Sequence, residues 1–265
     1  MKRIISEQSF LIVITLFFVA FIGFSCATSS DSAKNMSGDS SGQGGSMARF
    51  TISGDFLYTV DHKTLKVFDV SKPEQINYLE SRDQAVGIDI ETIFTMDTLL
   101  FIGSQNGMYI YDIKRPGLPL RLSSVQHIRS CDPVVAQGNY AYVTLNTENS
   151  WCGGNLNVLQ IYDISNPKEP ILMKTMPLDY PKGLGIDGNK LFICSNGVRV
   201  YDITSPTNPI WIDDLSYMPE AGGITMYDVI PRNGILLAVG ETGLWQFDYS
   251  GEKMSFVSKI AVNKD

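Results

Sequence analysis

The sequence predicts an all-β fold built from five repeated units. Nearly the same nine residues occur five times, and each copy contains an aspartate directly after an aromatic residue. The aspartates are spaced by 43, 51, 39 and 46 residues, and a four-stranded blade of a β-propeller occupies roughly 40–45 residues. We therefore expect a five-bladed β-propeller of four-stranded blades. The five copies are Leu65–Pro73, Met108–Pro116, Leu159–Pro167, Val198–Pro206 and Leu244–Glu252.

Each repeat contains four short apolar segments that are separated by Gly, Asn, Asp and Pro, as turns require. In the second repeat they read GIDIETIFTMD, LLFIGS, MYIYDI and LPLRLSSV. Segments such as LLFIG and YAYV are apolar at consecutive positions, which is typical of strands covered on both faces. The four segments of each blade follow in chain order, so we expect ring closure to depend on packing between the first and last blades.

The shared aspartates are expected to be structural. Each carboxylate can accept hydrogen bonds from backbone N–H groups of the following turn, and the proline four residues later fixes φ there. The fifth copy lacks this proline, as is common in a terminal repeat. The structural aspartates are Asp69, Asp112, Asp163, Asp202 and Asp248.

The N-terminus has the features of an export signal. Lys2 and Arg3 precede an apolar run over residues 10–24, which is shorter than the roughly 20 residues of a membrane-spanning helix. The run ends at Ser25-Cys26, which resembles the cleavage site of a bacterial lipoprotein signal peptide. This resemblance implies that residues 1–25 are removed, that Cys26 carries lipid, and that the protein is an outer-membrane lipoprotein facing the periplasm or the cell surface. The alternatives are an ordinary secretory signal, or an uncleaved anchor in which Cys26 has no role.

Residues 26–47 are predicted to form a flexible tether. Residues 27–47 contain seven serines, four glycines and almost no apolar side chains, so folding could not bury enough surface to offset the entropy of ordering them. We place the propeller at residues 48–265.

The repeated segment also resembles a known family. After a YAYV-type strand come an aromatic or apolar residue, Asp, Val or Ile, two variable residues and Pro, and this pattern resembles the LVIVD repeat of bacterial surface β-propeller proteins. The resemblance extends from Ala48 to about Val262, and four of the five copies match well. It implies a propeller with a cell-surface or periplasmic location, and it implies no reaction.

The third repeat contains the longest irregular loop, NTENSWCGGNLN. Cys152 in this loop and Cys131 at the start of the first strand are expected at the same end of the ring. An exported chain permits a Cys131–Cys152 disulfide, and the alternative is two free thiols. Cys194, in the apolar stretch KLFICS, is expected to be a buried small hydrophobe. Trp151 either contributes to a contact surface or packs over the bridge.

Alignment of the first strands places Ala48, Glu91, Asp132, Lys182 and Asp228 at equivalent positions around the mouth of the central channel. Its three carboxylates could hold a hard cation such as Ca²⁺ through oxygen ligands. They could equally form a solvated ring that nearby basic residues partly neutralise. The candidate binding face comprises Trp151, Tyr180, Glu91, Asp132, Lys182, Asp228 and Arg129.

Composition and motifs exclude several classes of function. The net charge is −7, with 21 basic against 28 acidic residues, and no basic run outside the N-terminus could neutralise nucleic-acid phosphates. The GxGxxG match at residues 183–188 precedes a predicted strand, whereas the dinucleotide fingerprint requires a helix there. No HExxH or CxxC motif is present. We expect no cofactor and no nucleic-acid partner.

The resulting interpretation is a non-catalytic, lipid-anchored and exported scaffold. Its partner would be another envelope protein or a glycan, and it would contact the membrane only through the lipid anchor. One alternative is a propeller hydrolase or lyase with a divalent cation at the carboxylate mouth. The other is a glycan-binding module, in which Trp151 and Tyr180 would lie exposed within one sugar's length of each other.

Overall fold

The computed structural model describes residues 45–127, 133–147, 156–215, 218 and 223–262. The chain divides into two compact units, Met1–Gly38 and Asp39–Asp265, and every described residue belongs to the second. In this described part the only helical element is the short 3₁₀ turn η1, Glu80–Arg82. Among the same residues, no helix has the length and apolar character needed to cross a membrane.

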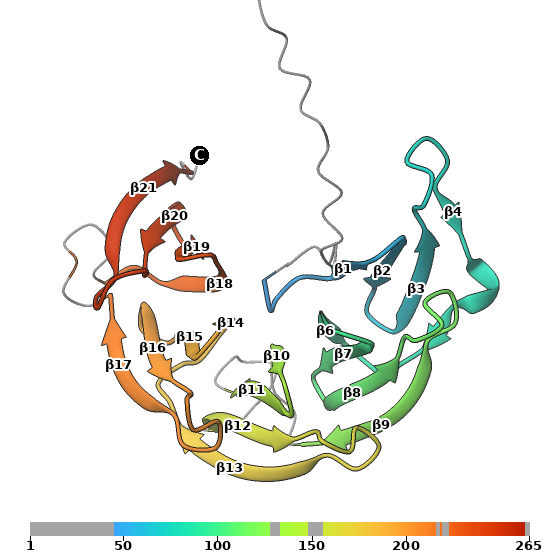
Figure 1. Cartoon of the computed structure of the whole chain (residues 1–265), viewed down its shortest axis with the longest axis horizontal. Helices are drawn as coiled ribbons and strands as arrows, with labels where there is room; N and C mark the ends of the chain where they lie inside the picture. Colours follow the sequence, from blue (N-terminus) through green and yellow to red (C-terminus); the bar gives the residue numbers. More distant parts are fainter. Residues whose placement is uncertain (1–44, 128–132, 148–155, 216–217, 219–222, 263–265) are drawn as a thin grey trace, which may run out of the picture. The chain divides into compact units, whose positions relative to one another are not determined.

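The strands form five sheets in chain order, which confirms the predicted five-bladed β-propeller (Figure 1). In four of the five sheets consecutive strands pair antiparallel throughout, so each of these blades is a simple meander. The first two blades contain β1 Phe50–Ser53, β2 Phe56–Val60, β3 Thr64–Asp69, β4 Asn77–Tyr78, β5 Gln84–Ala85, β6 Ile90–Met96, β7 Leu99–Ser104, β8 Gly107–Asp112 and β9 Leu120–Gln126. The third and fourth contain β10 Val134–Gln137, β11 Tyr140–Asn146, β12 Asn157–Asp163, β13 Ile171–Pro177, β14 Leu184–Asp187, β15 Lys190–Cys194, β16 Val198–Asp202 and β17 Ile210–Asp214. The fifth contains β18 Met226–Arg232, β19 Ile235–Gly240, β20 Gly243–Asp248 and β21 Ser255–Ala261.

The first blade departs from the four-strand pattern in its outer strand. Both β4 and β5 pair with β3, and the turn η1 separates them. Together they occupy the place of one outer strand, which is interrupted between Tyr78 and Gln84. The other four blades each have four continuous strands.

The core lies between neighbouring blades. We call the side of a blade that faces the next blade in chain order its forward face, and the opposite side its backward face. The third residue of each second strand lies on the forward face, and the second residue lies on the backward face. The forward residues Tyr58, Phe101, Tyr142 and Phe192 are all buried, each in a cluster that includes residues of the following blade.

Each contact between consecutive blades also carries a hydrogen bond to the turn that follows the shared aspartate. The acceptors are backbone carbonyls of the later blade, and the donors are side chains of the earlier blade. The bonds are Tyr58 Oη to Pro116 O (2.9 Å), Ser123 Oγ to Pro167 O (2.6 Å), Tyr142 Oη to Pro206 O (3.2 Å) and Lys190 Nζ to Tyr249 O (2.7 Å).

The shared aspartates close the turns between third and fourth strands. Each carboxylate Oδ1 accepts a hydrogen bond from the backbone N–H two residues later, which holds the turn locally. The five bonds run from Ser71 N to Asp69 (2.9 Å), Lys114 N to Asp112 (2.7 Å), Ser165 N to Asp163 (2.8 Å), Thr204 N to Asp202 (2.7 Å) and Ser250 N to Asp248 (2.8 Å).

The expectation that the first and last blades pack against each other is wrong. The two blades stand apart in Figure 1. Leu237 is the fifth-blade equivalent of the buried forward residues, yet it is only half-buried. On the backward face of the first blade Leu57 and Phe68 are also half-buried, whereas their equivalents in the other blades are buried. Both terminal blades therefore keep one apolar face that no other blade covers.

Candidate binding site at the loop end of the blades

The site lies where the first strands begin and where second strands turn into third strands. In antiparallel blades these two kinds of loop share one end of the ring, which is the end expected to carry the binding face. A pocket of about 650 Å³ opens there between the third, fourth and fifth blades. Its lining residues are Asn146, Tyr180, Lys182, Asn196, Gly197, Gly223, Ile224, Thr225 and Met226.

One wall of the pocket is the strap, which we define as residues 179–183 between β13 and β14. All three surrounding blades hold its backbone. From the third blade Thr144 Oγ1 donates to the Lys182 carbonyl (2.7 Å) and Asn146 Nδ2 donates to the Pro181 carbonyl (3.0 Å). Lys182 N donates to the Cys194 carbonyl in the fourth blade (2.8 Å), and Gly183 N donates to the Tyr227 carbonyl in the fifth (2.9 Å). The strap is therefore rigidly positioned, although it contains no regular secondary structure.

The outer end of the strap is held by side chains of the fourth blade. Ser195 Oγ donates to the Asp179 carbonyl (2.5 Å), and Arg199 Nη2 lies 2.8 Å from Asp179 Oδ2. Next to this anchor Tyr180 adopts a φ of 47°, in the left-handed region that a bulky residue rarely occupies. Tyr180 remains 53% exposed. The strained backbone thus presents an aromatic side chain at the rim of the pocket.

Lys182 is the cation of the pocket. Its Nζ lies 4.6 Å from the centroid of the Tyr227 ring, which is favourable for a cation–π interaction. Among the residues that the structure describes, Lys182 forms no ion pair. Its positive charge is therefore positioned but not neutralised by a carboxylate of this part of the chain.

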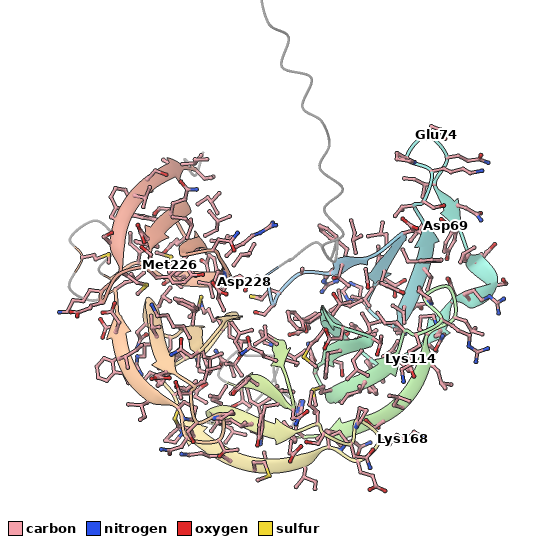
Figure 2. The ribbon with its side chains drawn as sticks, in the orientation of Figure 1. Asp69, Glu74, Lys114, Lys168, Met226 and Asp228 are labelled. Carbon is pink, nitrogen blue, oxygen red and sulfur yellow. The ribbon has the colours of Figure 1, made fainter. Side chains whose placement is uncertain are left out.

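Asp228 lies at the inner edge of the fifth blade, close to the start of the folded segment (Figure 2). Ser46 Oγ donates to its Oδ1 (2.9 Å) and Met47 N to its Oδ2 (3.1 Å), and the Asp228 Oδ1 also accepts from Val229 N (3.0 Å). Burial raises the pKa of the Asp228 carboxyl above its ordinary value, although these hydrogen bonds oppose the shift.

Ser46 and Met47 were expected in the tether, but they form part of the propeller unit. Leu184 N donates to Ser46 Oγ (2.7 Å), so this one hydroxyl connects the fourth blade to Asp228 of the fifth. Two residues later the Ala48 carbonyl accepts from Ile93 N of the second blade (2.9 Å). We call residues 45–48 the lead-in segment, because they connect three blades before the first strand begins.

Glycines make room for the Asp228 carboxylate. A Cβ on Gly45 would lie 2.0 Å from Asp228 Oδ2, and a Cβ on Gly183 would lie 2.3 Å from Asp228 Oδ1 and 2.7 Å from the Tyr227 carbonyl oxygen. The first glycine of the GxGxxG match is therefore required by close packing between the fourth and fifth blades.

Cys194 is a free, buried thiol, as the sequence predicts. Burial raises the pKa of this thiol, the negative charge of Asp228 raises it further, and the positive charge of Lys182 opposes the change. A neutral, inaccessible thiol is a poor nucleophile and a poor metal ligand. Cys194 therefore serves as a packing residue under the strap.

The structure corrects the predicted ring of mouth residues. In the fifth blade Asp228 pairs with Val239, the fifth residue of the second strand. In the second blade the fifth residue of the second strand is Gly103, and it pairs with Thr92. Glu91 precedes Thr92 in a bulge and accepts a hydrogen bond from Gln105 Nε2 (3.2 Å). Both first strands have a β-bulge at the same register position, so Tyr227 is the equivalent of Glu91 and Asp228 is the equivalent of Thr92.

The described residues contain no group of three His, Cys, Asp or Glu side chains arranged to hold a metal ion. Several predicted site residues fall outside the residues that the structure describes, so their predictions remain untested. They are the lipidation site Cys26, the pair Cys131 and Cys152, and Arg129, Asp132 and Trp151.

Of the predicted binding face, the structure brings Tyr180 and Lys182 together at the pocket. Sequence reasoning missed Asn196, Thr225 and the strap's anchors Thr144 and Asn146. The Asn196-Gly197 pair is a recognisable signal, since Asn-Gly between two apolar segments is typical of a tight hairpin turn. Such a turn places Asn196 at the loop end of the fourth blade.

Comparisons with known proteins support the repeat and the fold. The sequence model of the LVIVD repeat family matches residues 44–83 and 128–176, which include strands of the first and third blades. No curated protein matches the chain significantly.

Solved structures resemble the chain in fold. A functionally unknown protein from Desulfotomaculum acetoxidans matches with a TM-score of 0.64 at 11% identity, over 81% of this chain and 69% of that one. KlAtg21, solved in complex with the coiled-coil of AgAtg16, matches with a TM-score of 0.59 at 14% identity, over 81% of this chain and 69% of that one. AztD from Citrobacter koseri matches with a TM-score of 0.57 at 11% identity, over 78% of this chain and 61% of that one. At these identities the likeness concerns the fold alone.

Proposed function

We propose that this chain, which carries LVIVD repeats on a five-bladed β-propeller, is a non-catalytic binding scaffold of the bacterial cell envelope. Lipid on Cys26 would hold it at the outer membrane, facing the periplasm or the cell surface. The loop end of the blades would bind a partner, and the tether would give the propeller freedom to reach it.

The observation that carries this proposal is that hydrogen bonds hold the backbone of the strap in place beside the pocket. Three blades hold its backbone, yet its Tyr180 side chain is more than half exposed. Binding surfaces benefit from such preorganisation, since little conformational entropy is lost when a partner docks. Tyrosine is also among the residues enriched at energetically dominant contacts.

The partner we propose is another protein of the envelope. Rigid propeller loops suit this role, because a scaffold positions several contacts at once. KlAtg21, which shares the fold, was solved with a coiled-coil partner, and this is consistent with a propeller acting through protein contacts.

Site-specific photocrosslinking tests the binding face. We would place a photoreactive amino acid at position 180 and, as a matched control, at Lys168, an exposed residue in a turn at the opposite end of the blades. Irradiation of intact cells should give a discrete crosslinked protein from position 180 and none from position 168. A partner crosslinked only from position 168 would overturn the assignment of the binding face.

The lipid anchor is tested by replacing Cys26. Cys26→Ala should abolish incorporation of labelled palmitate and move the protein from the membrane to the soluble envelope fraction. Unchanged labelling and fractionation would contradict lipidation at this residue.

The metal content of the purified protein tests the non-catalytic role. Stoichiometric bound divalent metal would contradict the non-catalytic scaffold and favour a cation-dependent hydrolase or lyase.

A further inference from the structure

We infer that the pocket beside the strap binds a carboxylated saccharide, with the carboxylate at Lys182 and a sugar ring against Tyr180. This inference rests on the proposed binding role of the loop end, and it adds the chemistry of a ligand. The argument proceeds from the volume of the pocket, its charge, its aromatic rim and its hydrogen-bonding groups.

The pocket has the size of a ligand site. Its volume of about 650 Å³ lies within the ~300–1,000 Å³ of typical small-molecule sites. A few sugar units fit in this volume. Hydrogen bonds hold the strap, which forms this wall, in the absence of a ligand. The cavity is therefore formed before a ligand binds.

The charge of the pocket favours an anion. Lys182 is the only charged residue among the described residues that line it, and it has no ion-pair partner in that part of the structure. In the packing beneath, the Asp228 carboxylate is hydrogen-bonded to the lead-in segment and Cys194 is a buried thiol. In a chain of net charge −7, a positioned cation with no ion-pair partner among the described residues is a specific feature and not part of a general basic surface.

The aromatic rim favours a sugar ring. Tyr180 is exposed, and its backbone is fixed between Asp179, which Ser195 and Arg199 hold, and Pro181, which Asn146 holds. The aliphatic C–H face of a pyranose packs on such a ring without losing the hydration of its hydroxyls. The unusual φ of Tyr180 indicates that the surrounding contacts impose this presentation.

The remaining polar groups suit hydroxyls better than phosphate or peptide. Asn196 is exposed at the pocket and Thr225 lines it. A carboxamide and a hydroxyl both donate and accept hydrogen bonds, as sugar hydroxyls do. Arginine forks and nests of backbone N–H groups are typical of phosphate sites, whereas a single lysine matches the single charge of a carboxylate.

The direct test is calorimetric titration of the full exported chain in detergent. The acidic probes are trigalacturonate and 3′-sialyllactose; their neutral counterparts are methyl-esterified trigalacturonate and lactose, and triglutamate is the peptide control. We expect one acidic probe to bind with a Kd below about 1 mM and its neutral counterpart to bind at least about tenfold more weakly.

Substitutions connect the binding to the pocket. Lys182→Met retains the aliphatic stem and should weaken binding of the acidic probe by about tenfold or more, whereas Lys182→Arg should largely preserve it. Tyr180→Ala should weaken the acidic and the neutral probe by the same factor. Lys168→Met, at the opposite end of the blades, should change neither, and equal melting temperatures would show that each variant folds.

Three outcomes would overturn the inference. They are no binding of either acidic probe, equal binding of a neutral counterpart, and tighter binding of triglutamate than of both saccharides. Unchanged affinity of Lys182→Met would do the same. Each of these results leaves crosslinking from position 180 to a protein partner unaffected, so failure of the saccharide site and failure of the proposed binding face can be told apart.

Discussion

At the scale of single residues, Asp228 is the most informative position in the propeller. Its carboxylate is held by the lead-in segment and lies against Gly45 and Gly183, which have no side chain to displace it. Three hydrogen bonds and two glycines thus converge on one side chain. This arrangement gives two predictions.

Gly183→Ala should lower the free energy of unfolding by about 3 kcal/mol, because an added methyl group would clash with backbone as well as with Asp228. Gly251→Ala is the matched control: its Cβ would be 3.7 Å from the nearest atom, so its effect should stay within about 0.5 kcal/mol. Urea denaturation of both variants measures the difference. Similar costs at the two positions would show that the close approach at Gly183 is not maintained in solution.

Asp228 should also make stability depend on pH. Because its folded-state pKa is raised above the unfolded value, the carboxyl group favours the folded state most below the unfolded pKa, and this contribution is lost as pH rises through the folded pKa. The stability of the natural protein relative to Asp228→Asn should therefore decrease from pH 4 to pH 7, as measured by urea denaturation at each pH. A difference that grows with pH would mean that the hydrogen bonds from Ser46, Met47 and Val229 outweigh burial.

At the scale of elements, the inter-blade hydrogen bonds and the strap matter most. Tyr58→Phe removes the hydroxyl that donates to the Pro116 carbonyl, and we expect it to lower the free energy of unfolding by about 1 kcal/mol. Tyr227→Phe is the control, because Tyr227 is exposed and its hydroxyl makes no such bond to another blade among the described residues. Equal effects of the two substitutions in thermal or urea unfolding would show that the Tyr58 hydrogen bond does not contribute to stability.

The strands were predictable because their signal is local. Consecutive apolar residues in LLFIG or YAYV report burial on both faces, and Gly, Asn and Asp mark the turns. The one-residue offset between Glu91 and Asp228 was not predictable, because the register is fixed by pairing with the second strand and the sequence offers no marker of that pairing. The interruption between β4 and β5 likewise leaves no periodic pattern in the sequence.

The candidate site was predictable only in part. Topology placed Tyr180 and Lys182 at the loop end, since that end follows from the order of strands. Thr144 and Asn146 hold the strap through hydrogen bonds between residues more than 30 positions apart. No spacing within one repeat reveals such contacts.

At the scale of the whole propeller unit, the uncovered faces of the terminal blades distinguish this chain from a closed ring. Adjacent leucines of β19 provide the comparison: Leu236 faces the fourth blade and is buried, and Leu237 faces away and is half-buried. Leu236→Ala should cost about 3 kcal/mol of unfolding free energy, and Leu237→Ala about 1 kcal/mol. Equal losses in urea denaturation would indicate that the first blade covers Leu237 in solution.

The lead-in segment has a mechanical consequence. Tension transmitted along the chain from its N-terminus would reach the Ser46 and Met47 hydrogen bonds before it reached the edge of β1. The load would pass directly to the fourth and fifth blades, so that a pull on one end of the chain is borne by the sheets most distant from it in sequence. A propeller held in this way resists peeling from its first strand.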